Sequence, residues 1–382
     1  MKILLLAGEE SGAIYARRIR DRLAGHEVRG YDDYGFWTQD LAVIGVEEVL
    51  RNLLYLLRVK RTMERAIDEW RPDVVCTIDY PGMNMKLAAY AKRRGIRTVH
   101  VVCPQVWAWK AGRIPKIERT FDRLCCFLPF EPQLFSPGFA EFVGHPLVEE
   151  FGRAASPAPS VPFVGRPLVL ALLPGSRLGE VEKHLPVMLA AADSFSMPLE
   201  VVIPAANERA HAAISRIVTA HRMPISNCRL SAAANSRAPT IQVGGARELL
   251  LRADCAVVAS GTATLEAALA NCPTVLVYKA SPIFAVIARR MIKGVRFLGL
   301  ANIIWDKSLA AKGVTAPLAD APMPELLQEN FTAENLRALL EPLVWDATVR
   351  QTAKKRLSEA MNLLRSDGDA IGRIADEILD VD

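Results

Sequence analysis

The sequence predicts two doubly wound α/β domains joined by a short linker. Short apolar runs alternate with amphipathic helical stretches along most of the chain. These runs are continuously β-branched or Leu-rich, which is typical of parallel strands buried on both faces. A stretch rich in proline and small residues divides the alternation into two halves. At 382 residues, the chain is also too long for one ordinary core.

The first predicted domain covers residues 1–153. It opens with a strand, a Gly/Ser turn and a helix from about Ile14 to Leu23. The alternation with helices indicates βαβ units and therefore a parallel sheet. The predicted strands cover residues 2–7, 73–78, 97–103 and 123–128, and a helix over 85–93 lies between the second and third.

The second predicted domain covers residues 168–345, after a linker at 154–167 that reads AASPAPSVPFVGRP. Apolar residues at helical spacing then predict C-terminal helices over 346–382, which are free to cross back to the first domain. Two such domains place a ligand cleft at the carboxyl ends of their strands. The strands predicted here cover residues 168–173, 199–203, 240–243, 255–259 and 274–278.

Composition excludes several classes of protein. Hydrophobic residues make up 51% and charged residues 23%, which indicates a globular chain and not a disordered one. The net charge of +5 is too small to argue for nucleic acid, but it fits an anionic ligand or membrane surface. The seven cysteines contain no CxxC pair and are expected to be buried, reduced thiols in a cytosolic protein. No run approaches the roughly 20 apolar residues of a membrane span, so we predict a soluble or peripheral protein.

Two turns between a strand and a helix are candidate phosphate sites. In LLPGSR, Gly175 permits a sharp bend, Ser176 is a suitable N-cap, and Arg177 could bind a phosphate bidentately. An ordinary turn with a solvent-facing arginine is equally compatible with this motif. The second turn has small residues through which a diphosphate could approach backbone N–H groups, and it comprises Ser260, Gly261 and Thr262.

Carboxylates near these turns and in the first domain are candidates for other roles. Glu266 falls one helical turn beyond the second phosphate turn, where it could hold a ribose hydroxyl. Asp79 ends an apolar strand, where a charge is costly unless it is used, so it is a candidate general base. The alternative is that Asp79 caps the next helix, although Asn84 could do so instead.

Further candidates lie in loops of the first domain. The first turn, with Glu9, Ser11 and Gly12, is not GxGxxG and fits an acceptor-side loop or simply a tight turn. Gln105 lies in a loop with two tryptophans that could line a cleft or plug the domain. No carboxylate cluster has magnesium spacing and no Cys/His cluster has zinc spacing, so we predict no metal and no cofactor.

A basic, leucine-rich helix is predicted over residues 50–61, which read LRNLLYLLRVKR. Such a helix is typical of membrane-surface binding, although a core-packed helix with a cationic rim is a common alternative. The residues predicted to meet lipid are Leu53, Leu54, Leu57, Arg58 and Arg61.

The motifs occur in an order that resembles the bacterial lipid-A-disaccharide synthases. The segments that carry the resemblance span most of the chain and are Gly8-Glu9-Glu10-Ser11-Gly12, Asp79-Tyr80-Pro81-Gly82-Met83-Asn84, Pro104-Gln105-Val106-Trp107-Ala108-Trp109, Phe127-Leu128-Pro129-Phe130-Glu131, Phe142-Val143-Gly144-His145-Pro146, Leu172-Leu173-Pro174-Gly175-Ser176-Arg177 and Ser260-Gly261-Thr262-Ala263-Thr264-Leu265-Glu266. Three positions depart from the family pattern: Ala13 replaces an aspartate, Arg29-Gly30-Tyr31-Asp32-Asp33 replaces a Gly-Gly-Pro segment, and Leu300-Ala301-Asn302 replaces Leu-Pro-Asn.

The resemblance implies a GT-B fold of two Rossmann-like domains facing a cleft, and a specific reaction. UDP-2,3-diacylglucosamine and 2,3-diacylglucosamine 1-phosphate would give the β-1,6-linked disaccharide 1-phosphate and UDP, in a cytosolic enzyme at the inner face of the inner membrane. The family's base matches Asp79, and its other active-site residues match Arg177 and Glu266, with Asn302 at a further substrate-binding position.

We therefore predict an inverting, metal-independent glycosyltransferase that does not bind nucleic acid, and a homodimer is left open. Two alternatives remain at this point. Another sugar-nucleotide enzyme of the same architecture, such as an epimerase or a lipid-linked glycosyltransferase, would share the fold. A non-catalytic paralogue that binds a lipid-linked sugar nucleotide would fit the change at Ala13.

Overall fold

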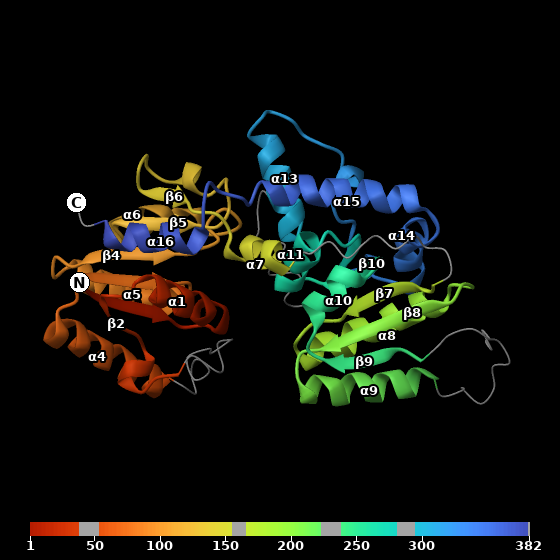
Figure 1. Cartoon of the computed structure of the whole chain (residues 1–382), viewed down its shortest axis with the longest axis horizontal. Helices are drawn as coiled ribbons and strands as arrows, with labels where there is room; N and C mark the ends of the chain where they lie inside the picture. The colour runs from red at the N-terminus through yellow and green to blue at the C-terminus, as the bar shows by residue number, and fades with distance from the viewer. Residues whose placement is uncertain (38–52, 155–165, 223–237, 281–294, 381–382) are drawn as a thin grey trace. The chain divides into compact units, whose positions relative to one another are not determined.

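The computed structural model describes residues 1–37, 53–154, 166–222, 238–280 and 295–380. The chain forms two compact units (Figure 1). Unit 1 comprises Met1–Glu149 and Leu364–Asp382, and unit 2 comprises Glu150–Leu363. Most of the predicted linker at 154–167 lies outside the described residues, as do residues 50–52 of the predicted basic helix.

Unit 1 is built on a six-stranded parallel sheet with the order β2-β1-β3-β4-β5-β6. β1 pairs with β3 in a register that sets Ala7 opposite Ile78, so the chain leaves both strands at the same edge. The segments after these strands, which contain Glu9 and Asp79, are therefore neighbours. The strands are β1 (Lys2–Ala7), β2 (Glu27–Arg29), β3 (Val74–Ile78), β4 (Arg97–Val101), β5 (Arg123–Cys126) and β6 (Ala140–Phe142).

Helices cover both faces of this sheet, which is why β3 is buried at every position and β1 and β4 at every position but the first. Ile3 and Leu5 of β1 pack into one core with α1 and α16, while Leu4 and Leu6 pack into a second core with α4 and α5. α16 belongs to this unit although it lies at the C-terminal end of the sequence. The helices are α1 (Glu10–Arg22), α4 (Leu53–Trp70), α5 (Pro81–Lys92), α6 (Ile114–Thr120) and α16 (Ala370–Leu379); α7 (Pro146–Ala154) contains the division between the units.

Unit 2 repeats the architecture with the parallel order β12-β11-β10-β7-β8-β9. Its largest core joins alternate residues of the strands to the apolar faces of α8 and α14. The strands are β7 (Leu168–Leu173), β8 (Leu199–Ala205), β9 (Thr240–Val243), β10 (Cys255–Ala259), β11 (Thr274–Tyr278) and β12 (Glu325–Leu327). The helices are α8 (Leu178–Asp193), α9 (Glu208–Arg222), α10 (Ala246–Arg252), α11 (Thr262–Leu269), α13 (Leu300–Ala310), α14 (Ala333–Trp345) and α15 (Ala347–Asn362).

The two helix-covered parallel sheets confirm the predicted fold class. Within the described ranges, no helix has the length and apolar character needed to cross a bilayer. The six cysteines that the structure describes are all buried and unpaired, which agrees with the predicted role as small apolar residues.

Candidate active site

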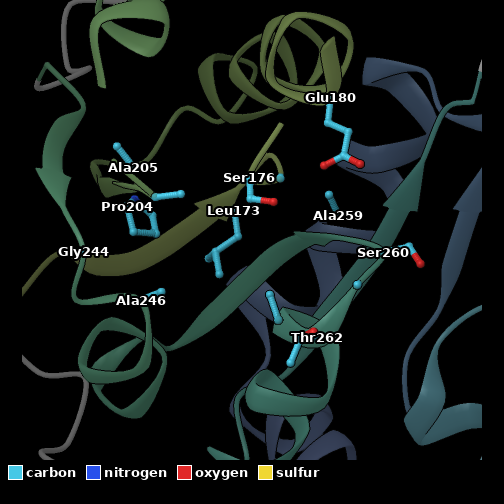
Figure 2. A pocket seen from close by; sticks show the side chains of 14 residues that line it. Leu173, Ser176, Glu180, Pro204, Ala205, Gly244, Ala246, Ala259, Ser260 and Thr262 are labelled. Carbon is cyan, nitrogen blue, oxygen red and sulfur yellow. The ribbon is translucent and has the colours of Figure 1, made fainter. Parts of the chain in front are cut away.

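A cavity of about 250 Å³ lies at the carboxyl ends of β7, β8 and β10 in unit 2. It joins the two predicted phosphate turns, because β7 and β10 are parallel neighbours and Leu173 lies opposite Val258. Figure 2 shows Leu173 and Ser176 on one side of the cavity and Ser260 and Thr262 on the other. The lining also includes Gly175, Glu180, Pro204, Ala205, Gly244, Ala246, Ala259 and Gly261.

The first turn depends on Gly175, whose φ of +116° lies in the region that favours glycine. A Cβ at this position would lie 2.5 Å from the Glu180 carboxylate, so no other residue fits without a shift. The prediction that Ser176 caps α8 is wrong, because the helix is capped at Arg177, which has extended backbone angles. Glu180 reaches back to the Arg177 backbone at 3.5 Å, and the capping role of a serine hydroxyl is not needed.

Arg177 points away from the protein interior. Its side chain is 65% exposed, and Nη1 lies 3.2 Å from Oε1 of Glu180. An exposed ion pair of this kind contributes little to stability. Arg177 does not line the cavity itself, but it directly follows Ser176, which does.

The second turn begins α11, with Gly261 as its N-cap at a φ of +151°. The first amides of an α-helix have no partner within the helix, and they make its N-terminus a site for anions. Here Thr264 donates from Oγ1 to the Gly261 carbonyl at 2.8 Å, which steadies the turn. Backbone N–H groups near Thr262 therefore begin at the edge of the cavity lined by Ser260 and Thr262.

Glu266 lies one turn farther into α11 and does not appear among the residues that line the cavity. Burial raises the pKa of its carboxyl, and the positive charge of Arg247 opposes that rise. Arg247 also donates to Glu150 at 2.8 Å. Glu266, which the sequence predicts to bind the ribose, thus lies in a group of charged side chains with Arg247 and Glu150.

His184 holds the first turn, a role that sequence reasoning missed. Its Nδ1 lies 2.8 Å from the Pro174 carbonyl, and the Lys279 backbone N–H donates to its Nε2 at 3.1 Å. These partners require Nδ1–H and an unprotonated Nε2, so the imidazole is neutral. Burial lowers the pKa of His184, which agrees with this state. A partner 95 residues away leaves no local sequence signal.

In unit 1, Asp79 and Tyr80 follow β3 with positive φ values of 48° and 49°. Asn84 holds this turn from the first turns of α5. It is completely buried, and its amide donates to the carbonyls of Leu6, Ile78 and Asp79 at 3.2, 3.2 and 2.8 Å. No side chain caps α5, so the alternative roles of Asp79 and Asn84 as helix caps are wrong.

Glu9 lies beside Asp79, because the chain leaves β1 and β3 at the same edge. The Tyr80 ring covers Gly8 so closely that a Cβ there would lie 2.2 Å from its Cδ1. Burial raises the pKa of both carboxyls, and the negative charge of Asp79 raises that of Glu9 further. The charge of Asp79 therefore opposes ionisation of Glu9.

The remaining predicted substrate residues occupy different environments. Gly12 packs against Ile78, since a Cβ there would lie 3.4 Å from its Cγ2. Ser11 lies in α1, and its side chain falls outside the described residues. Gln105 is exposed in the loop after β4. Asn302 is completely buried, and its amide bonds to Met323 and Glu325, so the structure does not bring it to the cavity.

One group of described residues could present three ligand atoms to a metal ion: Cys103, Cys126 and Glu131, all buried. Burial raises the pKa of Glu131 to about 8. Both of its oxygens already accept hydrogen bonds, from Trp107 Nε1 and from the Leu128 backbone N–H, each at 3.1 Å. This carboxyl therefore anchors the tryptophan loop that carries Gln105.

The predicted lipid-binding residues lie on α4, which has two different faces. Val59, Met63 and Ile67 are completely buried in the core of unit 1. On the other face, near the start of the helix, three leucines are exposed, with exposed fractions of 46% for Leu53, 82% for Leu54 and 41% for Leu57. Arg58 and Arg61 are exposed on the same helix.

Known structures share this fold over nearly the whole chain. MurG of Acinetobacter baumannii matches with a TM-score of 0.55 and 16% identity, covering 99% of both chains. The S. aureus MnaA–UDP structure matches with a TM-score of 0.58 and 13% identity, covering 99% of this chain and 95% of that one. The calicheamicin glycosyltransferase CalG4 has a TM-score of 0.53, with 16% identity over 100% of this chain and 98% of its own. Together they confirm the GT-B architecture.

Sequence comparison identifies the family. The family model described as lipid-A-disaccharide synthetase matches residues 3–369. The lipid-A-disaccharide synthase of Acidobacterium capsulatum is 36% identical over 88% of this chain and 82% of its own length. That of Xylella fastidiosa is 37% identical over 89% and 88%, and that of Anaeromyxobacter dehalogenans is 33% identical over 100% and 97%. This chain belongs to the lipid-A-disaccharide synthase family of glycosyltransferases.

Proposed function

We propose that this chain condenses UDP-2,3-diacylglucosamine with 2,3-diacylglucosamine 1-phosphate, giving the β-1,6-linked disaccharide 1-phosphate and UDP. The family supports a glycosyltransferase of lipid A biosynthesis. The observation that carries the donor assignment is the convergence of both phosphate turns, at Gly175–Ser176 and Ser260–Thr262, on one cavity in unit 2. Exposed Arg177 supplies the cation that a UDP diphosphate requires.

The proposed reaction is a single displacement. Asp79 takes the proton from the 6-hydroxyl of the acceptor, whose oxygen bonds to the anomeric carbon as the bond to the UDP oxygen breaks. Attack from the face opposite UDP inverts the centre. The diphosphate gains negative charge as it leaves, and the N–H groups at the start of α11 and the Arg177 guanidinium stabilise it without a metal ion.

Other residues bind and position the substrates. Glu266 holds the uridine ribose, and Ser176, Ser260 and Thr262 bind the diphosphate. The acceptor contacts the first turn, with Glu9, Ser11 and Gly12, and the exposed Gln105. Asn302 positions the surrounding chain and does not contact a substrate, because its amide donates to Met323 and Glu325.

UDP release by the purified protein tests this proposal. With both substrates and EDTA present, we expect UDP to form and the disaccharide 1-phosphate to accumulate in equal amount. Omission of the acceptor should abolish release. Release without acceptor would indicate a hydrolase or epimerase. No release from a folded protein that still binds UDP would instead indicate a binding paralogue.

The pH profile of the reaction should respond to Glu9. Because burial raises the pKa of Asp79, the acid limb of kcat/KM should have an apparent pKa above the ordinary value of an aspartate. Glu9→Gln removes a neighbouring carboxylate, so an ionised Glu9 no longer opposes ionisation of Asp79 and the acid limb should move to lower pH. Glu208→Gln, at the start of α9 in unit 2, is the control and should leave the limb in place.

We also propose that the exposed start of α4 binds the inner face of the inner membrane, where the acylated substrates reside. Leu54→Glu should weaken binding to vesicles of phosphatidylglycerol and phosphatidylcholine by roughly 10- to 100-fold, because it removes apolar burial and repels anionic lipid. Leu318→Glu is a matched control, since Leu318 is 60% exposed on unit 2. Equal loss of vesicle binding in both variants would contradict a membrane role for α4.

A further inference from the structure

A second cavity, of about 480 Å³, lies within unit 1 and takes no part in the mechanism described so far. It is bounded by β1, by one face of α1 and by residues 31–37 after β2. Three of its lining residues are alanines, at positions 7, 13 and 16, whose single methyl groups leave the space between strand and helix open. The cavity is therefore a product of small side chains at one end of the sheet.

Two arginines of α1 line this cavity together with the alanines. Ala13, Ala16, Arg17 and Arg20 follow one another at spacings of three, one and three residues, so they share one face of the helix. Arg20 lies 3.4 Å from both Asp32 and Asp33, a long contact for an ion pair. The charge of the lining is thus balanced only in part by Asp32, which also lines the cavity.

Arg17 is the second cation in the lining of this cavity. Its side chain is exposed, and it makes no hydrogen bond or ion pair with any residue in the described ranges. A guanidinium offers five N–H donors in a fork that matches a phosphate. With Arg20 one helical turn away, the cavity can present two guanidinium groups to one anion.

The opposite wall of the cavity is apolar and aromatic. Phe36 is buried, whereas Trp37 is 62% exposed although it lines the cavity. Aromatic rings next to guanidinium groups suit a ligand that carries both an anionic group and an apolar portion. An acylated sugar with a phosphomonoester has this chemistry. The proposed donor also carries acyl chains, but its diphosphate is assigned to the cavity of unit 2.

The cavity also lies at the edge of the sheet that carries the proposed base. Ala7 contributes to its lining and pairs with Ile78, the residue before Asp79. A Cβ on Gly12 would lie 3.5 Å from the Ala7 Cβ and 3.4 Å from the Ile78 Cγ2, so the start of α1 sits directly against both strand ends. A ligand in the cavity is therefore anchored on the same unit and the same sheet edge as Asp79.

We propose that this cavity binds the 1-phosphate of the acceptor sugar, with Arg17 as its principal ligand and Arg20 as the second. The assignment rests on the proposed function, since it takes the acceptor to be an acylated glucosamine 1-phosphate. It gives unit 1 a means of selecting phosphorylated acceptors over phosphate-free ones.

Equilibrium binding to the full-length protein tests the assignment without requiring turnover. The probes are short-chain diacylglucosamine 1-phosphate, the same sugar without its phosphate, and inorganic phosphate. Arg17→Ala should raise the Kd of the phosphorylated sugar by about tenfold or more and leave the Kd of the phosphate-free sugar unchanged. Arg17→Lys should restore part of the affinity, because it keeps the charge but loses the fork. Arg119→Ala, an exposed arginine of α6, is the matched control.

The outcomes separate this proposal from the proposed reaction. Equal loss of affinity for both sugars, or no loss for either, would overturn the phosphate site. Inorganic phosphate that binds as tightly as the sugar phosphate would show a site for free phosphate instead. If binding depends on Arg17 but no UDP is released, the cavity assignment stands and the reaction fails. If UDP is released and Arg17→Ala leaves the acceptor KM unchanged, the reaction stands and the cavity assignment fails.

Discussion

Replacing Asp79 by asparagine is expected to lower kcat by roughly 10²- to 10⁴-fold, the usual contribution of a positioned general base. Asparagine keeps nearly the same shape and cannot accept a proton. The buried Asn84 amide donates to the carbonyls of Ile78 and Asp79, so the backbone of this turn should stay in place. The measurement is acceptor-dependent UDP release at saturating concentrations of both substrates.

Two comparisons make this prediction specific to the base. Asp21→Asn changes an exposed carboxylate of α1 in the same unit and should leave kcat unchanged. The affinity of Asp79→Asn for UDP should also be unchanged, because the diphosphate is assigned to unit 2. A kcat within about threefold of the unmodified enzyme would mean that another group takes the proton.

The fold was predictable where strands are long and buried on both faces. β1, β7, β10 and β11 have the bounds that the sequence predicts, because their apolar runs end at polar or small residues. β9 also has its predicted bounds, although it is an edge strand with no buried residue. Three strands were missed: β2, β6 and β12, each of three residues. They lie at or near the edges of their sheets, and β2 and β6 have no fully buried residue, so no apolar run marks them.

The sequence predicts the turns of the candidate site but not the side chains that hold these turns in place. Gly175, and Gly261 within the small residues at 260–262, predict sharp turns because few residues other than glycine adopt such positive φ angles. The side chains that hold the turns come from distant positions or from competing caps. Glu180 takes the role expected of Ser176, and His184 ties the turn to Lys279 across the sheet. Such bonds depend on tertiary packing, which no local pattern encodes.

Basic amphipathic character alone could not distinguish the two interpretations of the helix over 50–61. The structure shows why both were reasonable. One face of α4 packs into the core through Val59 and Met63, whereas Leu53, Leu54 and Leu57 remain exposed. The described part of this helix therefore serves the core with one face and presents leucines to its surroundings on the other, near its start.

Replacing Arg177 by alanine is expected to lower kcat by roughly 10²- to 10³-fold, as loss of one preorganised donor to a developing negative charge commonly does. The guanidinium is 65% exposed and, within the described ranges, forms its ion pair with Glu180, so its removal should leave the free energy of unfolding nearly unchanged. The effect should fall mainly on kcat, because the leaving diphosphate gains charge in the transition state. UDP affinity should fall less.

Arg337→Ala is the matched control for this prediction, since Arg337 forms a similarly exposed pair with Glu341 on α14 of the same unit. It should change neither kcat nor UDP affinity. Arg177→Lys should recover only part of the rate, because an ammonium cannot bind two phosphate oxygens in parallel. If Arg177→Ala instead raised the donor KM and left kcat intact, Arg177 would bind the ground state and the transition state equally. The charge on the leaving diphosphate would then be stabilised by the N–H groups at the start of α11 alone, and UDP-sugar binding would be the whole contribution of the first turn.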